Sequence, residues 1–232
     1  MNILKILLSL LTLVCIGGCA KQVKMTDKLE PIIISQSDFL RDLSENDLAF
    51  LNGGALQITR DPTTNLPRMI EGKFSEKIIL TAEDAILSLS SVRSIMSIGE
   101  LSYSCISIDD DRNEYRVFSL KQIYSGVPVD GGEFQVITLK NGEPAAIRGA
   151  YQRVADIDTI PIVSESDAKE ILKNECGAVA RSVELVIFTS LENPTCLSWK
   201  YYTKAKNPLD EKIVYINAID GKLLAEYPVA ID

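Results

Sequence analysis

The feature that most constrains the fold is a pattern that occurs twice, a short helical segment followed by strands with alternating apolar residues. The first helix is predicted to begin at Thr81, a residue type favoured at helix N-caps, and strands follow over residues 101–151. The second is predicted to begin at Ser164, and strands follow over residues 183–227. Strands joined by short turns pair antiparallel, and a helix can cover one face of such a sheet. The sequence therefore predicts an α+β fold with two helix-on-antiparallel-sheet units.

Shorter elements are expected around these units. They are a helix over residues 39–51 ended by Gly53-Gly54, strands over 55–60 and 68–73, and an irregular crossing over 124–129. Asn141-Gly142 is the signal for a type I′ hairpin turn. Four strands between residues 101 and 151 are thus expected to form an antiparallel meander.

The N-terminus is typical of an export signal. Lys5 is followed by an apolar run from Ile6 to Ile16, which is shorter than the roughly 20 residues of a spanning helix. The sequence Ile16-Gly17-Gly18-Cys19 resembles the bacterial lipobox, whose cysteine is acylated and becomes the new N-terminus. We expect residues 1–18 to be a lipoprotein signal peptide, Cys19 to carry lipid, and residues 19–38 to form a tether. This places the protein in the cell envelope, anchored to the membrane and outside the cytoplasm. The alternatives are a plain secretory signal with an incidental cysteine, or an uncleaved anchor.

The absence of histidine excludes several kinds of catalytic site. The chain has no histidine, which excludes Ser-His-Asp and Cys-His triads and the His-Glu-x-x-His zinc motif. The net charge is -8, and removal of the signal with its single Lys5 makes it -9. Such an acidic surface argues against nucleic acid as a partner. We expect no catalytic, cofactor-binding or metal-binding residues. An enzyme that uses carboxylates is a weaker alternative, and a loose calcium site at the Asp109–Asp111 run is another.

Three cysteines remain once Cys15 has left with the signal and Cys19 has been lipidated. Cys176 and Cys196 can pair if their Cα atoms lie within about 7 Å. Cys105 would then be a buried free thiol. A three-thiolate zinc site is the alternative, although the three cysteines lack the usual close spacing.

Residues 117–136 carry a family resemblance. The stretch resembles the core of the fungalysin/thermolysin propeptide module, whose pattern is filled by Gln122, Tyr124, Gly126, Pro128, Val129 and Gly132. The helix from Ser164 and the closing segment 214–224 are similar to the PepSY module that follows in the same propeptides. The resemblance implies a cystatin-like propeptide domain over residues 39–158 and a PepSY-like domain over residues 159–232. Taken singly, the motif residues are explained by turns and packing.

Propeptides of this kind chaperone and inhibit their own peptidase. Here the resemblance implies a freestanding copy, not itself an enzyme, that binds a thermolysin-like metallopeptidase in trans as inhibitor, folding chaperone or both. The candidate partner contacts are Tyr124, Val229, Ala230, Ile231 and Asp232. The C-terminal residues would lie in the enzyme's cleft like a cleaved product, and a frayed end is the alternative. The alternative function is a surface adhesin or envelope binding module that reuses the fold without a peptidase partner.

Overall fold

The computed structural model describes residues 30–110, 114–190, 194–205 and 207–229. Across these residues the strands form one continuous, mostly antiparallel sheet in two parts. The first sheet contains, in spatial order, β1 (Ile32–Ile33), β4 (Ser102–Asp109), β5 (Tyr115–Tyr124), β6 (Val127–Leu139), β7 (Pro144–Gly149), β3 (Pro67–Glu71) and β2 (Gln57–Arg60). The second contains β8 (Val179–Phe188), β9 (Cys196–Lys204), β10 (Lys212–Asn217) and β11 (Leu223–Pro228). The two sheets meet where β6 and β8 run parallel, with Val129 opposite Ile187.

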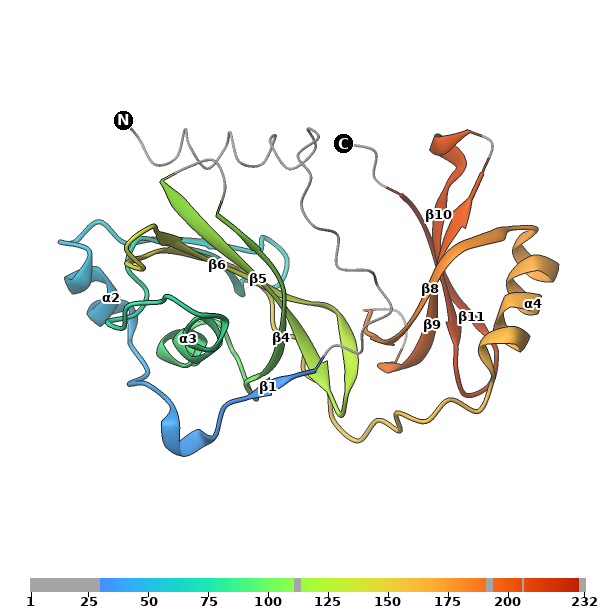
Figure 1. Cartoon of the computed structure of the whole chain (residues 1–232), viewed down its shortest axis with the longest axis horizontal. Helices are drawn as coiled ribbons and strands as arrows, with labels where there is room; N and C mark the ends of the chain where they lie inside the picture. The colour runs from blue at the N-terminus through green and yellow to red at the C-terminus, as the bar shows by residue number, and fades with distance from the viewer. Residues whose placement is uncertain (1–29, 111–113, 191–193, 206, 230–232) are drawn as a thin grey trace.

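Helices lie on one face of each sheet (Figure 1). The helical segments are η1 (Gln36–Asp38), α2 (Glu45–Leu51), α3 (Ala82–Ser88) with its continuation η2 (Leu89–Val92), α4 (Glu165–Cys176) and η3 (Pro208–Asp210). The predicted starts are confirmed, since Thr81 and Ser164 are the N-caps of α3 and α4. Helix α3 packs against β5, and α4 packs against β8 and β10. The fold class is therefore α+β, as expected.

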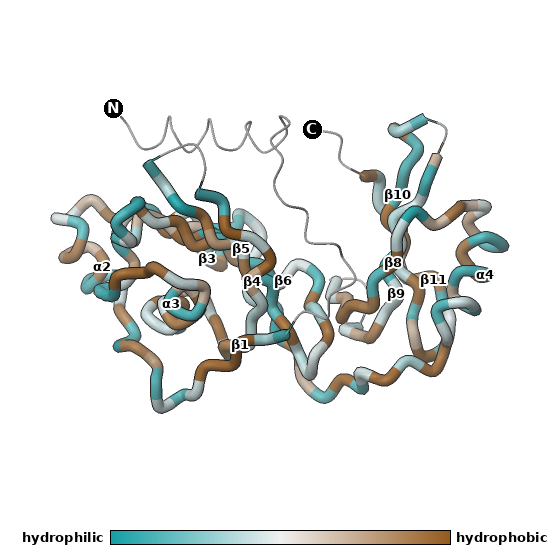
Figure 2. The backbone as a smooth tube through the Cα atoms, in the orientation of Figure 1, coloured by the Kyte–Doolittle hydropathy of each residue, from teal (hydrophilic) through white to brown (hydrophobic). Residues whose placement is uncertain are grey.

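Each helix buries its apolar side against its sheet. Under α3 and η2 the buried residues are Ile86, Leu89, Phe118, Leu120, Phe134, Val136 and Ile147. Under α4 they are Ala168, Leu172, Tyr201, Val214 and Ile216. Full burial of one such aliphatic or aromatic side chain contributes about 1.5–3 kcal/mol, so these clusters hold the elements in place. Figure 2 shows the hydrophobic stretches in the strands of the first sheet. Among the described residues, no helix is both long enough and apolar enough to cross a bilayer.

The structure corrects two boundaries near the start of the described chain. The helix expected over residues 39–51 begins only at Glu45, because Ser44 and Asp47 form a capping box there. The backbone N–H of Leu43 instead donates to the carbonyl of Ser91 at 2.7 Å. Residues 32–38, expected in the tether, contain β1 and η1. Ile32 lies opposite Tyr103 and packs against the first core, so the fold begins before residue 39.

Two turns also differ from expectation. Residues 124–129 are a tight hairpin rather than an irregular crossing, because Tyr124 pairs with Val127 around Ser125 and Gly126. Ser125 and Gly126 both have positive φ, 47° and 83°, as a type I′ turn requires. At Asn141-Gly142 only Gly142 is in this region, with φ 85°. The turn is present there but is not type I′, because the loop between Leu139 and Glu143 has three residues instead of two.

Candidate functional site

The residues of the propeptide-like motif build the join between the two sheets. Gln122 donates from Nε2 to the carbonyl of Gln152 at 2.8 Å, and the N–H of Gln152 donates back to Oε1 at 3.0 Å. This side chain lies across Gly132, where a Cβ atom would sit 2.5 Å from Oε1 and 2.9 Å from Cβ of Gln122. Gly132 therefore permits the Gln122 bridge that fixes the linker after β7 to the β5–β6 hairpin.

Two further motif residues, Tyr124 and Val129, pack in an apolar cluster at the same place. Val127 and Val129 are buried with Ile187, Leu197 and Ala218 from the second sheet and its final turn. Tyr124, a predicted partner contact, is half-buried, and its side chain packs against this cluster. The structure thus gives Tyr124 a packing role at the join.

Beside this cluster, Asp130 of the first sheet pairs with Lys200 of the second, and another ion pair lies within the first sheet. Asp130 Oδ1 lies 2.5 Å from Lys200 Nζ, and Asp130 Oδ2 accepts a hydrogen bond from Tyr215 at 2.6 Å. Lys121 Nζ lies 2.6 Å from Glu133 Oε1. The lysine side chains are only 9% and 10% exposed, so these charges depend on their partners instead of water.

These groups point away from both helices. Leu120 packs under α3, so its neighbour Lys121 faces the opposite side of the first sheet. Tyr201 packs under α4, so its neighbour Lys200 faces the opposite side of the second sheet. In the strand pairing, Lys200 stands between Glu184 on β8 and Tyr215 on β10. We call this helix-free surface the junction face; its members are Lys121, Asp130, Glu133, Glu184, Lys200 and Tyr215.

The electrostatics of the junction face follow from burial and pairing. Burial lowers the pKa of Lys200, but the hydrogen bond and charge of Asp130 outweigh it, and the pKa lies above its ordinary value. Burial and Asp130 together raise the pKa of Tyr215. Burial also raises the pKa of Glu184, in spite of the charges of Lys121 and Lys200 nearby. Burial thus sets the direction of the shift for Tyr215 and Glu184, whereas pairing with Asp130 sets it for Lys200.

Aromatic rings extend the junction face toward the C-terminal edge of the sheet. Phe188 and Tyr215 stack with ring centroids 4.2 Å apart, and Tyr215 meets Tyr227 edge-on at 6.0 Å. Lys200 Nζ lies 5.4 Å from the ring centroid of Tyr202 and 5.6 Å from that of Tyr215. Phe188 and Tyr215 are only 3% and 4% exposed, so their rings belong to a small buried cluster on this side of the sheet, whereas Tyr227, 46% exposed, is open to a partner.

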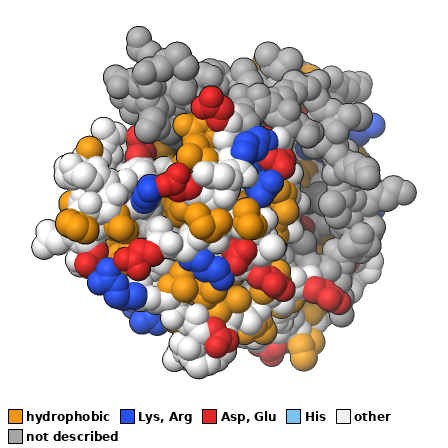
Figure 3. Space-filling model, turned by 60° about the vertical axis from the view of Figure 1, so that its left-hand side comes forward, with side chains coloured by type: hydrophobic (Ala, Val, Ile, Leu, Met, Phe, Trp, Pro, Cys, Tyr) orange, Lys and Arg blue, Asp and Glu red, His pale blue; other side chains and the backbone are white. Residues whose placement is uncertain are grey.

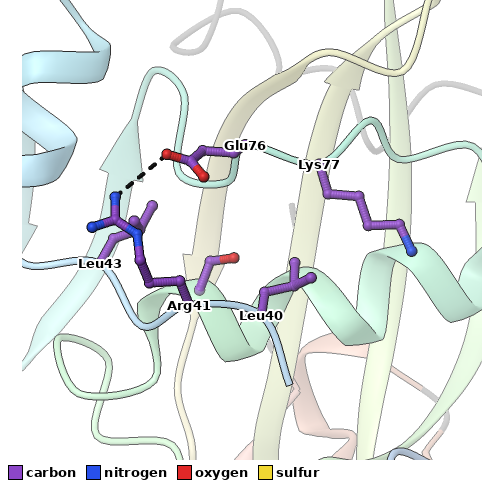
Figure 4. Close-up of a pocket in the computed structure, with 6 residues that line it drawn as sticks. Leu40, Arg41, Leu43, Glu76 and Lys77 are labelled. Atoms are coloured by element: carbon purple, nitrogen blue, oxygen red, sulfur yellow. Dashed lines mark hydrogen bonds and ion pairs between the residues drawn. The ribbon is translucent and has the colours of Figure 1, made fainter. Parts of the chain in front are cut away.

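The described residues also line two shallow hollows, one of them next to Tyr227. One, of about 270 Å³, is lined by Leu40, Arg41, Leu43, Glu76, Lys77 and Ser91. Figure 4 shows Arg41 and Glu76 pointing toward one another, with nitrogen and oxygen 3.4 Å apart, while Lys77 extends along the other side. Figure 3, which brings the left-hand side of Figure 1 forward, shows hydrophobic, acidic and basic side chains interleaved. The second hollow, of about 310 Å³, lies by Leu209, Lys212 and Tyr227.

The structure does not bring the candidate disulfide cysteines together. The Cys176 thiol bonds to Glu226 near Lys212, and Lys212 in turn bonds to Thr203 near the end of β9. Cys196 is the first residue of β9 and precedes Thr203 by seven residues. At 3.3 Å per residue, Cys196 and Thr203 are about 23 Å apart, so Cys176, which lies near Thr203, is beyond the 7 Å limit for a disulfide with Cys196. Both thiols are free, and so is the thiol of Cys105. Cys105 was expected to be buried but is only half-buried. Among the described residues, no group of Cys, Asp or Glu side chains has metal-ligand geometry.

The predicted lipid and tail residues fall at the ends of the chain. Cys19, Ala230, Ile231 and Asp232 lie outside the described residues. Val229 is held, since its N–H donates to the carbonyl of Glu211 at 3.0 Å. The described chain therefore ends with a residue that is bonded to the fold, directly after the edge strand β11.

Sequence reasoning missed the charged part of the junction face. Lys121 and Lys200 occur within long strands, where a solvent-exposed lysine is the ordinary expectation. Only their three-dimensional neighbours reveal that both are buried and paired.

No family model and no curated protein matches the chain significantly. Among solved structures, the chain is similar to the YpeB C-terminal domain of Bacillus megaterium. The two share 19% sequence identity with a TM-score of 0.41, over 83% of this chain and 100% of that chain. A TM-score of 0.41 is too low to support a functional inference.

Proposed function

We propose that this chain is a membrane-anchored, propeptide-like lipoprotein that binds a thermolysin-like metallopeptidase in trans, as an inhibitor, a folding chaperone or both. In this proposal residues 39–158, with β1 added, form the propeptide-like unit and residues 159–232 form the PepSY-like unit. The lipid on Cys19 holds both at the outer side of the membrane, where an emerging peptidase would meet them. The protein itself carries out no catalysis.

The observation that supports this proposal most is the position of the motif residues. The segment that resembles the propeptide module forms the β5–β6 hairpin, and Val129 of that hairpin provides the pairing with β8. The residues that carry the resemblance thus lie where the first sheet pairs with the second. A fixed angle between the sheets presents the junction face as one preorganised surface, which lowers the entropic cost of binding a partner.

The proposed tail contact is consistent with this surface. Tyr227 touches Tyr215 of the junction face and is 46% exposed. Pro228 ends β11 directly after it, so the tail starts at the border of the junction face. A partner that contacts the exposed ring of Tyr227 would therefore lie next to the start of the tail.

The test is binding and inhibition by residues 20–232, purified without the lipid and mixed with a thermolysin-type peptidase from the same organism. We expect inhibition of peptide hydrolysis, or a higher refolding yield of the denatured peptidase. Tyr227→Ala should weaken binding at least tenfold, because exposed aromatic anchors dominate such interfaces. Phe50→Ala is the matched control, since Phe50 is 87% exposed on the distant α2.

The outcomes separate the candidate functions. Failure to bind, inhibit or refold any such peptidase argues against the proposal and in favour of a binding module that reuses the fold. A variant without residues 230–232 that inhibits as well as the parent removes the tail from the mechanism. For the anchor, Cys19→Ser should abolish palmitate labelling and release the protein from the membrane fraction.

A further inference from the structure

The hollow beside Tyr227 has two apolar walls that are open to water. Leu209, in η3, is 71% exposed, and Tyr227, near the end of β11, is 46% exposed. Both line the same hollow of about 310 Å³, together with Pro228. Scattered exposed apolar residues are ordinary on a protein surface, but large ones that face a shared concavity mark a surface that a partner can cover.

The charged residues that line this hollow are mostly acidic. They are Asp210, Glu211, Lys212 and Glu226, three carboxylates and one ammonium group with a net charge of -2. Lys212 Nζ lies 2.7 Å from Glu226 Oε2, and Arg181 Nη1, from outside the hollow, lies 2.7 Å from Glu211 Oε2. One negative charge remains when Arg181 is included, so the hollow favours a cationic group over an anionic one.

Asp210 carries this remaining charge. Its backbone N–H donates to the carbonyl of Asn207 at 3.0 Å, but its side chain forms no hydrogen bond or ion pair with another described residue. The charge of Asp210 does act on Lys212, whose ammonium is directed to Glu226. A cation supplied by a partner can therefore pair with Asp210 without breaking an existing ion pair.

A guanidinium group suits this combination of walls and charge. It is planar and always charged, it pairs with carboxylates, and it stacks on aromatic rings. The methylene groups that carry it can lie along an apolar side chain such as that of Leu209. Tyr227 already meets Tyr215 with ring centroids 6.0 Å apart, yet it stays half-exposed, so its ring has room for a second contact.

We propose that the hollow between Leu209 and Tyr227 binds an arginine side chain of a protein partner. The guanidinium pairs with Asp210 and stacks on the ring of Tyr227, and its methylene groups lie against Leu209. That this partner is the peptidase rests on the proposed function, whereas the arginine site itself does not.

A peptide titration followed by NMR tests the site. The protein is ¹⁵N-labelled residues 20–232, and the probe is acetyl-Leu-Arg-Leu-amide at millimolar concentration. We expect the amide signals of residues 207–212 and 225–229 to shift. The same peptide with citrulline, which has the shape of arginine without its charge, should bind about fivefold more weakly or worse.

Two variants separate the charge from the ring. Asp210→Asn should weaken binding of the arginine peptide and leave the citrulline peptide unaffected. Tyr227→Leu, which keeps an apolar wall but removes the ring, should reduce the preference for arginine. Asp38→Asn is the matched control and should change nothing, because Asp38 ends η1 as Asp210 ends η3. The proposal is overturned if both peptides bind equally well, if the signals that shift lie outside these residues, or if none shifts.

The titration needs no peptidase, so its result is separate from the test of inhibition. Binding of the arginine peptide in a protein that binds no peptidase would refute the proposed function and leave the arginine site standing. A peptidase that binds the parent and Asp210→Asn equally tightly would overturn the assignment of its arginine to this hollow, while the proposed function would stand.

Discussion

Replacement of Asp130 by Asn tests whether the ion pair at the join holds the two sheets together. Asp130 contacts Lys200 at 2.5 Å and accepts from Tyr215 at 2.6 Å, and these partners come from β9 and β10 of the second sheet. Asn keeps the size of the side chain and can still accept from Tyr215. It removes the negative charge, so the buried ammonium of Lys200 is left without its counter-ion.

The expected loss follows from the burial of the pair. Removal of one partner from a fully buried ion pair costs about 3–5 kcal/mol. The side chains of Lys200 and Asp130 are 10% and 17% exposed, and Asn retains one hydrogen bond. We therefore expect Asp130→Asn to lower the free energy of unfolding by about 2–3 kcal/mol. For a chain of this length that corresponds to a fall in Tm of about 4–12 °C.

Denaturant and thermal unfolding of residues 20–232 measure this loss. The matched control is Glu76→Gln, which breaks the Arg41–Glu76 pair, whose side chains are 60% and 59% exposed, and should cost under about 0.5 kcal/mol. The double variant Asp130→Asn with Lys200→Met removes both charges and should recover most of the loss. A loss for Asp130→Asn no larger than that for Glu76→Gln would refute the reasoning.

The remaining predictions concern backbone space, pH and the thiols. Gly149 has φ 141°, and a Cβ there would lie 2.0 Å from the carbonyl oxygen of Glu133. Gly149→Ala should therefore cost over about 3 kcal/mol in denaturant unfolding, against about 1 kcal/mol for Gly53→Ala in open space, and equal costs would contradict the geometry. Burial raises the pKa of Asp84, but hydrogen bonds from Lys77 and the N-cap outweigh it and hold the pKa below its ordinary value. Ionised Asp84 thus stabilises the fold above the ordinary carboxyl pKa of about 3.9, and this is lost as the pH falls. Asp84→Asn should cost about 1 kcal/mol at neutral pH and almost nothing at about pH 2, and a cost independent of pH would exclude this role. Alkylation in denaturant without reductant should label three thiols, and labelling of only one would reveal a disulfide. These thiols are Cys105, Cys176 and Cys196.

Local rules predicted the starts of the helices because capping involves residues only three apart. Thr81 accepts from the N–H of Asp84, and Ser164 accepts from the N–H of Asp167, as sequence spacing alone suggests. The same rule, applied to Ser44 and Asp47, would have placed the start of α2 correctly. The motif over residues 117–136 also marked the join, although its pattern did not reveal what it joins.

The cysteine pairing shows where local rules fail. Cys176 and Cys196 are close in sequence and both border turns, which makes a pairing seem reasonable. The direction of α4 along the second sheet places Cys176 beside Glu226, at the opposite end of β9 from Cys196. The direction in which α4 runs over the sheet depends on tertiary packing, because it is set by which side chains of the helix are buried against the strands.

By itself the sequence determined the α+β class and the two helix starts, because periodicity and capping act over short stretches of chain. The export-like N-terminus stays a prediction, since it falls on residues outside the described part of the chain. Only the tertiary structure decided that β6 runs parallel to β8 and that Asp130 meets Lys200 and Tyr215, which lie 70 and 85 residues away. Contacts over such separations depend on how two sheets pack, and a lysine in a strand looks the same in sequence whether it faces water or a buried carboxylate.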